Sequence, residues 1–408
     1  MISYYECSLC HHQWQPNQVL YTCPDDGGNL NTILDFNGVK PSDILNSPEA
    51  SLWRYTPLLP VGDPGYQLTP LHQVGLTPVY QPAALREKLG LKHLFIKDES
   101  RNPSASFKDR ASAIVVARAL ETKVKTIVAA STGNAGAAMA CMSAAVGLPA
   151  IILAPKTAPP AKLAQLLVFG AKVILVDGNY DQAFDLSLAA SREFGWYNRN
   201  TGFNPFTVEG KKTAGFEIWE QVLLHLHSHQ RLTVFISVGD GNILSGVYKG
   251  FKDLLSLGWL ERMPRIIGVQ AEGSAAVANA FFSGSDQITP VRSTTVADSI
   301  SVDLPRDGLR ALYAVRESEG FMLTVSDSEI LAAIPELGRA GIFAEPAAST
   351  AYAGLVKAVS EKLFDPSEPV LVLSTGSGLK DIKAAAQSVI PAPVIEPTLQ
   401  SLRKVIHV

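Results

Sequence analysis

The sequence predicts an α/β protein in which two domains, each built on a parallel sheet, enclose a ligand-binding cleft. Short apolar runs alternate with helical stretches from residue 94 onward, and the alternation occurs in two successive series. Strands that alternate with helices form parallel sheets whose faces the helices cover. Three of the apolar runs end in glycine-rich turns, and such turns bind ligands at the carboxyl edge of a parallel sheet.

The composition indicates an ordinary globular enzyme. The chain has 408 residues, of which 47% are hydrophobic and 18% charged, and its formal net charge is −3. This length allows two or three domains, and the small negative charge does not favour nucleic acid or anionic membranes as partners. We expect a cytoplasmic protein, because no apolar stretch is long enough to span a membrane and the first residues lack a secretory signal. Four cysteines in a chain of this size do not form a disulfide framework.

The first 50 residues are expected to form a small segment similar to a degenerate zinc ribbon. A zinc ribbon holds its metal between two cysteine pairs, each from a tight turn. Here the second pair lacks its second cysteine, and Asp26 stands in that place. The candidate ligands are Cys7, Cys10, Cys23 and Asp26, with His11 or His12 as alternatives to Asp26. Either these residues bind a structural zinc ion or packing alone holds the segment together.

The first series of strands and helices follows a proline-rich connector at 36–80. We expect strands at 94–97, 126–130, 150–154 and 173–176, with helices at 112–120 and 137–146. A second series begins near Phe216, and its expected strands are 233–238, 266–270 and 369–373. The chain would thus consist of the ribbon-like segment 1–50, a larger α/β domain of 51–95 and 205–390, a smaller α/β domain of 96–204, and a tail of 391–408.

Lys108 is the candidate catalytic residue. It lies in Ser106-Phe107-Lys108-Asp109-Arg110, at the expected start of a helix, where burial and the helix dipole both lower the pKa of a lysine. A lysine whose amine is often neutral forms a Schiff base with an aldehyde. An isolated lysine in a helix is more simply explained by an exposed position, so the meaning of Lys108 depends on the turns that follow it.

Three glycine-rich turns each precede a helix, and each is a candidate anion site because the N–H groups and the dipole at a helix N-terminus favour negative charge. They are Ser131-Thr132-Gly133-Asn134-Ala135-Gly136, Gly239-Asp240-Gly241-Asn242 and Thr375-Gly376-Ser377-Gly378. A reactive lysine together with several such turns predicts pyridoxal phosphate, which carries both an aldehyde and a phosphate. The alternative for each turn is a structural role as a helix cap, which contributes about 1 kcal/mol of stability.

The residue types in the turns suggest which part of the substrate or the cofactor each turn binds. The turn at 131–133 offers hydroxyl and backbone N–H donors that suit a substrate α-carboxylate, and Asn134 suits a ring oxygen of the cofactor. Glycines in the turn at 239–242 let the backbone approach a phosphate closely, although Asp240 repels a phosphate unless its side chain points away. Thr375 can offer its hydroxyl to the pyridine nitrogen.

Taken together, these motifs resemble the threonine synthase branch of the fold type II (tryptophan synthase β-like) pyridoxal-phosphate-dependent enzymes. The likeness covers almost the whole chain and includes Trp53-Arg54-Tyr55, Gly75-Leu76-Thr77-Pro78, Asn204-Pro205-Phe206, Glu209-Gly210-Lys211-Lys212-Thr213 and Glu345-Pro346. Enzymes of this branch are lyases of threonine biosynthesis that convert O-phosphohomoserine and water to threonine and phosphate. The resemblance therefore implies an amino-acid substrate and, as is common for this fold, a homodimer.

The resemblance also implies roles for individual residues. Lys108 would carry the cofactor as an internal aldimine and would move protons at the substrate Cα and Cβ. The cofactor contacts would be Phe107, Asn134 at the 3′-hydroxyl, Gly239, Asp240, Gly241 and Asn242 at the phosphate, and Thr375 at the ring nitrogen. The substrate contacts would be Ser131, Thr132, Gly133, Lys211, Lys212 and Arg306.

Two places depart from the family pattern. One is the segment that is usually a basic Ile-Arg-Ile-Gly-Asn-Pro-like stretch and reads Ser299-Ile300-Ser301-Val302-Asp303-Leu304-Pro305-Arg306-Asp307-Gly308 here, and the other is residue 207. Members of this branch usually have an arginine, suited to a substrate phosphate, where this chain has Thr207. Lys211, Lys212 or Arg306 would have to compensate for it. The alternative is a related reaction on another amino acid, either β-elimination, as in threonine or serine dehydratases, or β-replacement, as in cysteate synthase. A metabolite-binding protein without catalysis would not need the complete set of cofactor residues, and the chain lacks the dinucleotide motif of a nicotinamide oxidoreductase.

Overall fold

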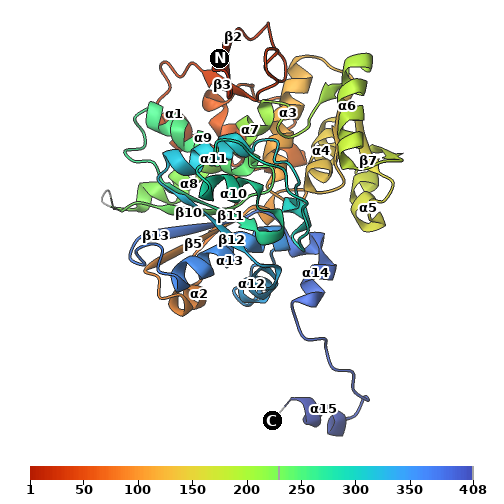
Figure 1. The fold of residues 1–408 in the computed structure, drawn as a ribbon, viewed down its shortest axis with the longest axis vertical. Helices are drawn as coiled ribbons and strands as arrows, with labels where there is room; N and C mark the ends of the chain where they lie inside the picture. The colour runs from red at the N-terminus through yellow and green to blue at the C-terminus, as the bar shows by residue number, and fades with distance from the viewer. Residues whose placement is uncertain (228–229, 407–408) are drawn as a thin grey trace.

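The computed structural model describes residues 1–227 and 230–406, which form three β-sheets and the helices around them (Figure 1). The N-terminal sheet is antiparallel and has the order β2-β1-β3. Its strands are β1 (Ile2–Cys7), β2 (Gln13–Trp14) and β3 (Leu30–Leu34), and the short helix α1 (Pro41–Leu45) follows them. Tyr5, Cys7, Cys23 and Leu30 belong to a small apolar core within this segment, separate from the cores of the α/β part.

The larger α/β sheet has six strands in the order β12-β11-β10-β13-β5-β4, and all neighbours are parallel except β4 and β5. Its strands are β4 (Val79–Tyr80), β5 (His93–Asp98), β10 (Thr233–Ser237), β11 (Arg265–Ala271), β12 (Phe321–Val325) and β13 (Pro369–Ser374). Alternate side chains enter two cores: Val234 and Ile236 belong to one, and Phe235 to the other. Because both faces are covered, the inner strands are continuous apolar runs in the sequence.

Helices cover both faces of the larger sheet (Figure 1). One face packs against α2 (Ala83–Lys88), α12 (Asp327–Arg339) and α13 (Pro346–Ser360). The other packs against α8 (Thr213–Gln221), α9 (Asn242–Ser256), α10 (Ala276–Phe282) and α11 (Gly308–Glu317). Helix starts follow local chemistry: Ser326 and Glu329 form a capping box at α12, and α13 begins with a proline.

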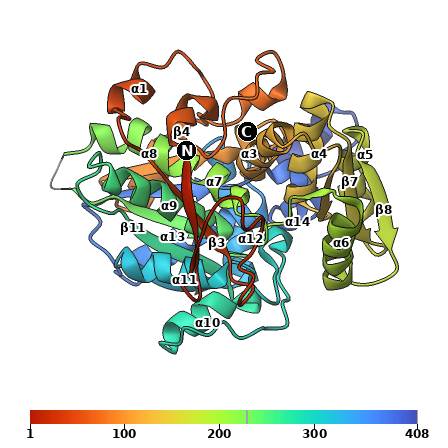
Figure 2. The same ribbon diagram turned by 90° about the horizontal axis from the view of Figure 1, so that it is seen from above.

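The smaller α/β sheet is wholly parallel, with the order β8-β7-β6-β9. Its strands are β6 (Ile127–Ala130), β7 (Ala150–Pro155), β8 (Lys172–Val176) and β9 (Tyr197–Asn198). The associated helices are α3 (Lys108–Glu121), α4 (Asn134–Val146), α5 (Pro160–Val168), α6 (Tyr180–Phe194) and α7 (Phe206–Lys211), several of which are seen beside the larger sheet in Figure 2. Ile114 of α3 and Phe216 of α8 belong to one apolar core, so the two α/β parts share a continuous interior.

The expected boundary between the two α/β domains requires a correction. A boundary between residues 95 and 96 would divide β5, but the whole strand pairs with β13, from His93 opposite Pro369 to Asp98 opposite Ser374. β5 therefore belongs entirely to the larger sheet. A short apolar run fits either of two parallel sheets, and only its pairing partner decides between them.

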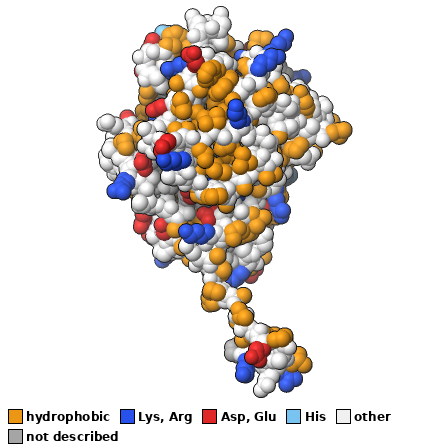
Figure 3. Space-filling model, turned by 90° about the vertical axis from the view of Figure 1, so that its right-hand side faces the viewer, with side chains coloured by type: hydrophobic (Ala, Val, Ile, Leu, Met, Phe, Trp, Pro, Cys, Tyr) orange, Lys and Arg blue, Asp and Glu red, His pale blue; other side chains and the backbone are white. Residues whose placement is uncertain are grey.

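The end of the chain extends away from the α/β part. After α14 (Ile382–Gln387), the chain runs out to α15 (Leu399–Val405), as Figures 1 and 3 show. Among the described residues, no helix combines the length and the apolar character needed to cross a membrane.

Candidate active site

The turns after β6, β10 and β13 open into one cavity of about 480 Å³. This arrangement follows from the parallel sheets, since the carboxyl ends of parallel strands lie at the same edge of each sheet. The predicted site residues in the cavity wall are Lys108, Ser131, Thr132, Gly133, Asn134, Lys211, Gly239, Asp240, Gly241, Asn242, Arg306 and Thr375. The fold therefore brings the lysine and all three glycine-rich turns together.

Lys108 is the first residue of α3 and is held by the turn after β13. Phe107 donates its backbone N–H to the carbonyl oxygen of Thr375 at 2.8 Å. Beside this bond, Ser106 and Gly376 form an antiparallel bridge. These backbone contacts place Lys108 and Thr375 in the wall of the same cavity, although they lie far apart in the sequence.

The Lys108 amine loses its proton more readily than the amine of an ordinary lysine. Burial lowers its pKa to about 8; Asp240 and Glu345 oppose this change, and Arg199 adds to it. With a pKa near 8, about a tenth of the amine is neutral at pH 7, compared with less than about a thousandth for an ordinary lysine. Lys108 can therefore attack an aldehyde at neutral pH.

The turn before α4 is closed by Ser131. Its hydroxyl accepts hydrogen bonds from the backbone N–H groups of Gly133 at 3.3 Å and Gly136 at 3.0 Å. Gly136 has no room for a side chain, because a Cβ atom would lie 2.7 Å from the Ser131 carbonyl oxygen. The Ser131 hydroxyl is thus engaged within the turn, while Thr132 and Gly133 line the cavity at the N-terminus of α4, where an anion is favoured.

Asn134 and Glu345 form a polar pair in the cavity wall. The Asn134 side-chain amide donates to the two carboxylate oxygens of Glu345 at 2.9 and 3.1 Å. Burial raises the pKa of Glu345, and Asn134 and Lys380 oppose that rise. Glu345 was part of a predicted motif but was not predicted as a site residue. The sequence signal that could have marked it is the proline that follows, since a proline at the first helical position indicates the start of a helix.

The turn before α9, residues 239–242, contains two glycines, so a ligand can approach its backbone closely. Gly241 has φ +89°, and a Cβ atom there would lie 2.6 Å from the carbonyl oxygen of Asp307. The Asn242 side chain accepts from Lys211 Nζ at 2.5 Å and donates to the Asp307 carboxylate at 2.8 Å. A glycine turn at the N-terminus of a 15-residue helix, with a lysine beside it, is suited to a phosphate.

Asp240 lies within this turn and also lines the cavity. Its carboxylate accepts from the backbone N–H of Arg306 at 3.3 Å, and its carbonyl oxygen accepts from the N–H of Asp307 at 2.9 Å. Burial raises the pKa of Asp240, while the backbone N–H of Arg306 and the nearby Lys108 and Lys211 oppose that rise. Arg306 reaches the cavity from the neighbouring loop and pairs with Asp181 at 3.0 Å.

Two predicted contacts, Phe107 and Lys212, do not line the cavity. Phe107 is fully buried, and its backbone rather than its ring supports the site. Lys212 pairs with Glu209 at 2.7 Å and with Asp253 at 2.8 Å. Successive residues of a helical segment point about 100° apart, so Lys212 is directed into the protein when Lys211 faces the cavity.

Arg199 is a cavity residue that sequence reasoning missed. It follows β9 and is 1% exposed, and its Nε and Nη1 donate to Ser112 Oγ at 3.1 Å and Thr201 Oγ1 at 2.9 Å. Its Nη2 has no hydrogen-bond partner among the described residues, and neither has Ser237 Oγ, another buried atom of a cavity residue. Burial lowers the pKa of Arg199 to about 10, so it remains charged at neutral pH. No charge pattern in the sequence marks this residue.

The cavity fits the predicted pyridoxal phosphate. The Lys108 amine suits its aldehyde, and the turn at 239–242 leaves bare backbone at a helix N-terminus for its phosphate. Unpaired buried polar atoms are rare in folded proteins unless a ligand or water satisfies them. Arg199 Nη2 and Ser237 Oγ are two such atoms of residues in the cavity wall.

Comparisons with known proteins agree with this geometry. The family described as "Pyridoxal-phosphate dependent enzyme" matches residues 71–376. A Methanosarcina acetivorans protein named threonine synthase is 36% identical over 98% of each chain. The same holds for a protein of that name from Methanocaldococcus jannaschii. The processed form of threonine deaminase isoform 2 from Solanum lycopersicum has a similar fold, with a TM-score of 0.65 at 23% identity over 79% of this chain and 90% of that one.

Proposed function

Because the chain belongs to the pyridoxal-phosphate-dependent enzyme family, and within it to the threonine synthase branch, we propose that it converts O-phosphohomoserine and water to threonine and phosphate. The observation that carries this proposal is the set of three cationic side chains, Arg199, Lys211 and Arg306, in the wall of the cavity that holds Lys108. A substrate phosphate would be attracted to these side chains, whereas a substrate without one would leave them without a ligand anion.

Different cavity residues would contact different parts of the cofactor. Pyridoxal phosphate, when bound, supplies an aldehyde for a lysine amine and a ring that accepts electrons from the substrate Cα. We assign the aldehyde to Lys108, the phosphate to the turn at 239–242, the 3′-hydroxyl to Asn134 and the ring nitrogen to the Thr375 hydroxyl. A neutral hydroxyl leaves the ring nitrogen largely unprotonated, so more of the proton transfer depends on Lys108.

Lys108 moves protons along the carbon chain of the substrate. Its amine carries one extra proton at a time, so it gives up each proton before it takes the next. Over the whole reaction it takes protons from Cα and Cβ and returns protons to Cγ and Cα, while the phosphate leaves Cγ. Water adds its hydroxyl at Cβ, and the remaining proton of water goes to the departing phosphate. A pKa near 8 suits a group that both accepts and donates protons near neutral pH.

Arg199 supplies the positive charge that the family pattern led us to expect at position 207. Thr207 does not line the cavity, and its hydroxyl donates to the carbonyl oxygen of Asn204 at 2.8 Å. Lys211 and Arg306 line the cavity together with Arg199. Burial, with Lys108 and Arg199 nearby, holds the pKa of Lys211 well below its ordinary value, and a bound phosphate would favour its charged form.

A steady-state assay with purified protein and added pyridoxal phosphate tests this proposal. Phosphate release from O-phosphohomoserine with one threonine formed per phosphate would support it. Production of a 2-oxo acid from threonine or serine, without turnover of phosphohomoserine, would instead support β-elimination and contradict the proposal. Replacement of the phosphate of phosphoserine by an added nucleophile would support β-replacement and would also contradict the proposal.

The protein is further proposed to act as a homodimer in the cytoplasm. Large hydrophobic side chains gather on the face formed by α5, α6 and the edge strand β8 (Figure 3). They include Leu167, Val168, Ile174 and Leu175, which are 37–83% exposed. A second copy that covers this face would bury them. Light scattering of the purified protein tests the dimer, and a monomer at micromolar concentration would contradict it.

A further inference from the structure

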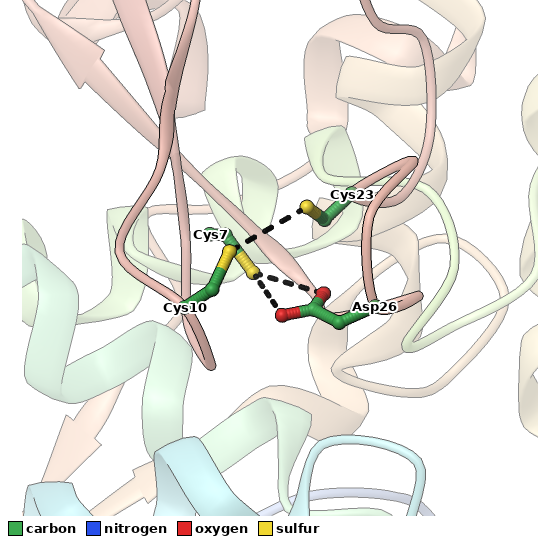
Figure 4. A group of neighbouring side chains, drawn as sticks. All are labelled: Cys7, Cys10, Cys23 and Asp26. Atoms are coloured by element: carbon green, nitrogen blue, oxygen red, sulfur yellow. Dashed lines mark hydrogen bonds between the residues drawn. The ribbon is translucent and has the colours of Figure 1, made fainter.

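The N-terminal segment carries a compact group of four side chains outside the catalytic cavity. Cys7 ends β1 and Cys10 lies in the turn after it, while Cys23 and Asp26 lie in the turn before β3. The four side chains point toward one another (Figure 4), and their ligand atoms all lie within 4.8 Å of one another. Each turn therefore contributes two ligands that are three residues apart.

The distances match a tetrahedral zinc centre. With Zn–S bonds of about 2.3 Å, tetrahedral geometry separates two sulfur atoms by about 3.8 Å and a sulfur from a carboxylate oxygen by about 3.5 Å. Cys10 Sγ lies 3.8 Å from Cys23 Sγ, and Cys7 Sγ lies 3.3 and 3.5 Å from the two Asp26 oxygens. These separations fit a zinc ion, and the remaining ligand atoms of the group lie within 4.8 Å of one another.

From this geometry we propose that Cys7, Cys10, Cys23 and Asp26 bind one structural zinc ion. Three thiolates select a soft metal such as zinc, and a closed set of four protein ligands leaves no position for substrate. The alternative ligands are engaged elsewhere, since His12 Nδ1 contacts the Asp25 carboxylate at 3.0 Å and His11 lies beside Glu6.

Backbone N–H groups hold the ligands in place. Leu9 donates to Cys7 Sγ at 3.3 Å, and Gly28 donates to the Asp26 carboxylate at 2.8 Å. Such bonds orient metal ligands and are part of most built metal sites. Gly28 also admits no side chain, because a Cβ atom there would lie 2.6 Å from Cys7 Sγ.

The loop that carries Cys23 and Asp26 is connected by hydrogen bonds to the turn at 239–242, which we assign to the cofactor phosphate. Asn29, three residues after Asp26, donates from its side-chain amide to the carbonyl oxygen of Arg306 at 2.8 Å and to the carboxylate of Asp307 at 2.9 Å. The other Asp307 oxygen accepts from the Asn242 side chain at 2.8 Å. By ordering this loop, the zinc ion stabilises the turn at 239–242, so its removal weakens cofactor binding. This second step rests on the proposed cofactor site.

Metal analysis of the purified full chain tests the zinc site independently of catalysis. The expected content is one zinc per chain, which Cys7→Ser and Cys23→Ser lose. The matched control is Cys141→Ser, because Cys141 is buried in α4 outside the group and should retain the metal. Asp26→Cys should also retain zinc, since it restores the usual four-cysteine set.

Three results would overturn the zinc site. The wild-type chain could remain free of zinc after dialysis against Zn²⁺ under reducing conditions, it could hold iron instead, or Cys7→Ser could bind as much zinc as wild type. Because Cys7→Ser and Cys23→Ser could fail to fold, Co²⁺ substitution of the wild-type chain adds a second readout. A tetrahedral thiolate site would give thiolate-to-cobalt charge-transfer bands, and their absence would count against the site.

The link to the active site is tested by titrating pyridoxal phosphate into cofactor-free protein and following its absorbance. Chelation of zinc or Asn29→Ala should weaken cofactor binding by about fivefold or more, whereas Asn37→Ala, an exposed change in the following turn, should not. Unchanged affinity in the zinc-free protein would overturn the link. If the wild-type chain bound no pyridoxal phosphate at all, the proposed function would fail while the metal analysis still decided the zinc site.

Discussion

The backbone N–H of Phe107 donates to the carbonyl oxygen of Thr375 at 2.8 Å. This bond connects the residue before the candidate catalytic lysine with the residue that we assign to the cofactor ring nitrogen. Because both groups are backbone atoms, the spacing between Lys108 and the turn after β13 does not depend on flexible side chains. The site is therefore organised by the fold before any ligand binds.

Lys108→Ala should abolish the yellow absorbance of covalently bound pyridoxal phosphate. The alanine has no amine to react with the aldehyde, and activity should fall by about 10³-fold or more because the acid–base group is also lost. Absorbance spectra and a steady-state assay measure both effects. Lys156→Ala is the control, since this lysine lies on the surface paired with Asp177. Retention of the absorbance in Lys108→Ala would exclude Lys108 as the attachment point.

Arg199→Met should raise the KM for phosphohomoserine by about 10- to 100-fold, which corresponds to about 1.5–3 kcal/mol for hydrogen bonds to a charged group. Binding of an unphosphorylated analogue such as homoserine should change much less. The exposed Arg192 of α6 provides the control substitution Arg192→Met. Equal weakening of both ligands would show that Arg199 shapes the cavity rather than binding the phosphate.

The rate of pyridoxal phosphate uptake by cofactor-free protein should rise with pH through about 8. Below that pH the Lys108 amine is protonated and cannot attack, and above it the amine is neutral, whereas an ordinary lysine would place the midpoint near 10.5. Arg199→Met should move the midpoint upward, because a nearby positive charge favours the neutral amine. Stopped-flow absorbance measures the profile, and a wild-type midpoint near 10.5 would contradict the lowered pKa.

Gly241→Ala should weaken pyridoxal phosphate binding, while Gly258→Ala should not. Both glycines have positive φ, +89° and +70°, so alanine destabilises the fold by about 1 kcal/mol at either position. Only at Gly241 does the added Cβ meet backbone, at 2.6 Å from the Asp307 carbonyl oxygen, whereas nothing lies within 4 Å at Gly258. Thermal unfolding and cofactor titration separate the two effects. Normal cofactor affinity in Gly241→Ala would argue against the phosphate assignment.

Arg110→Met should destabilise the cofactor-free protein by about 3–5 kcal/mol. Arg110 contacts Glu99 at 2.7 Å and Glu217 at 2.5 Å, and all three side chains are fully buried beneath α3. Removing the guanidinium leaves buried carboxylates with insufficient positive charge. Arg86→Met, which removes an exposed pair with Glu87, should cost less than about 1 kcal/mol. Similar melting temperatures for the two variants would contradict the expected difference in stability.

The sequence by itself determined much of the fold and the centre of the site. Strands such as β10 and β13 were predicted because a strand buried on both faces must be apolar along its length. Lys108 and the three glycine-rich turns were predicted to share a cleft, because the turns follow parallel strands. The structure places them around one cavity. β12 was not predicted, since its five residues are a short run that also fits a buried helix segment.

Only the tertiary structure decided which residues share a contact. It assigned β5 to the larger sheet, turned Lys211 toward the cavity and Lys212 away from it, and brought Arg199 into the wall. It also placed Asp26, rather than a histidine, beside the three cysteines. The physical reason is that a sequence pattern reports whether a position is buried, whereas the partner of a buried group comes from a distant segment and is known only once the chain has folded.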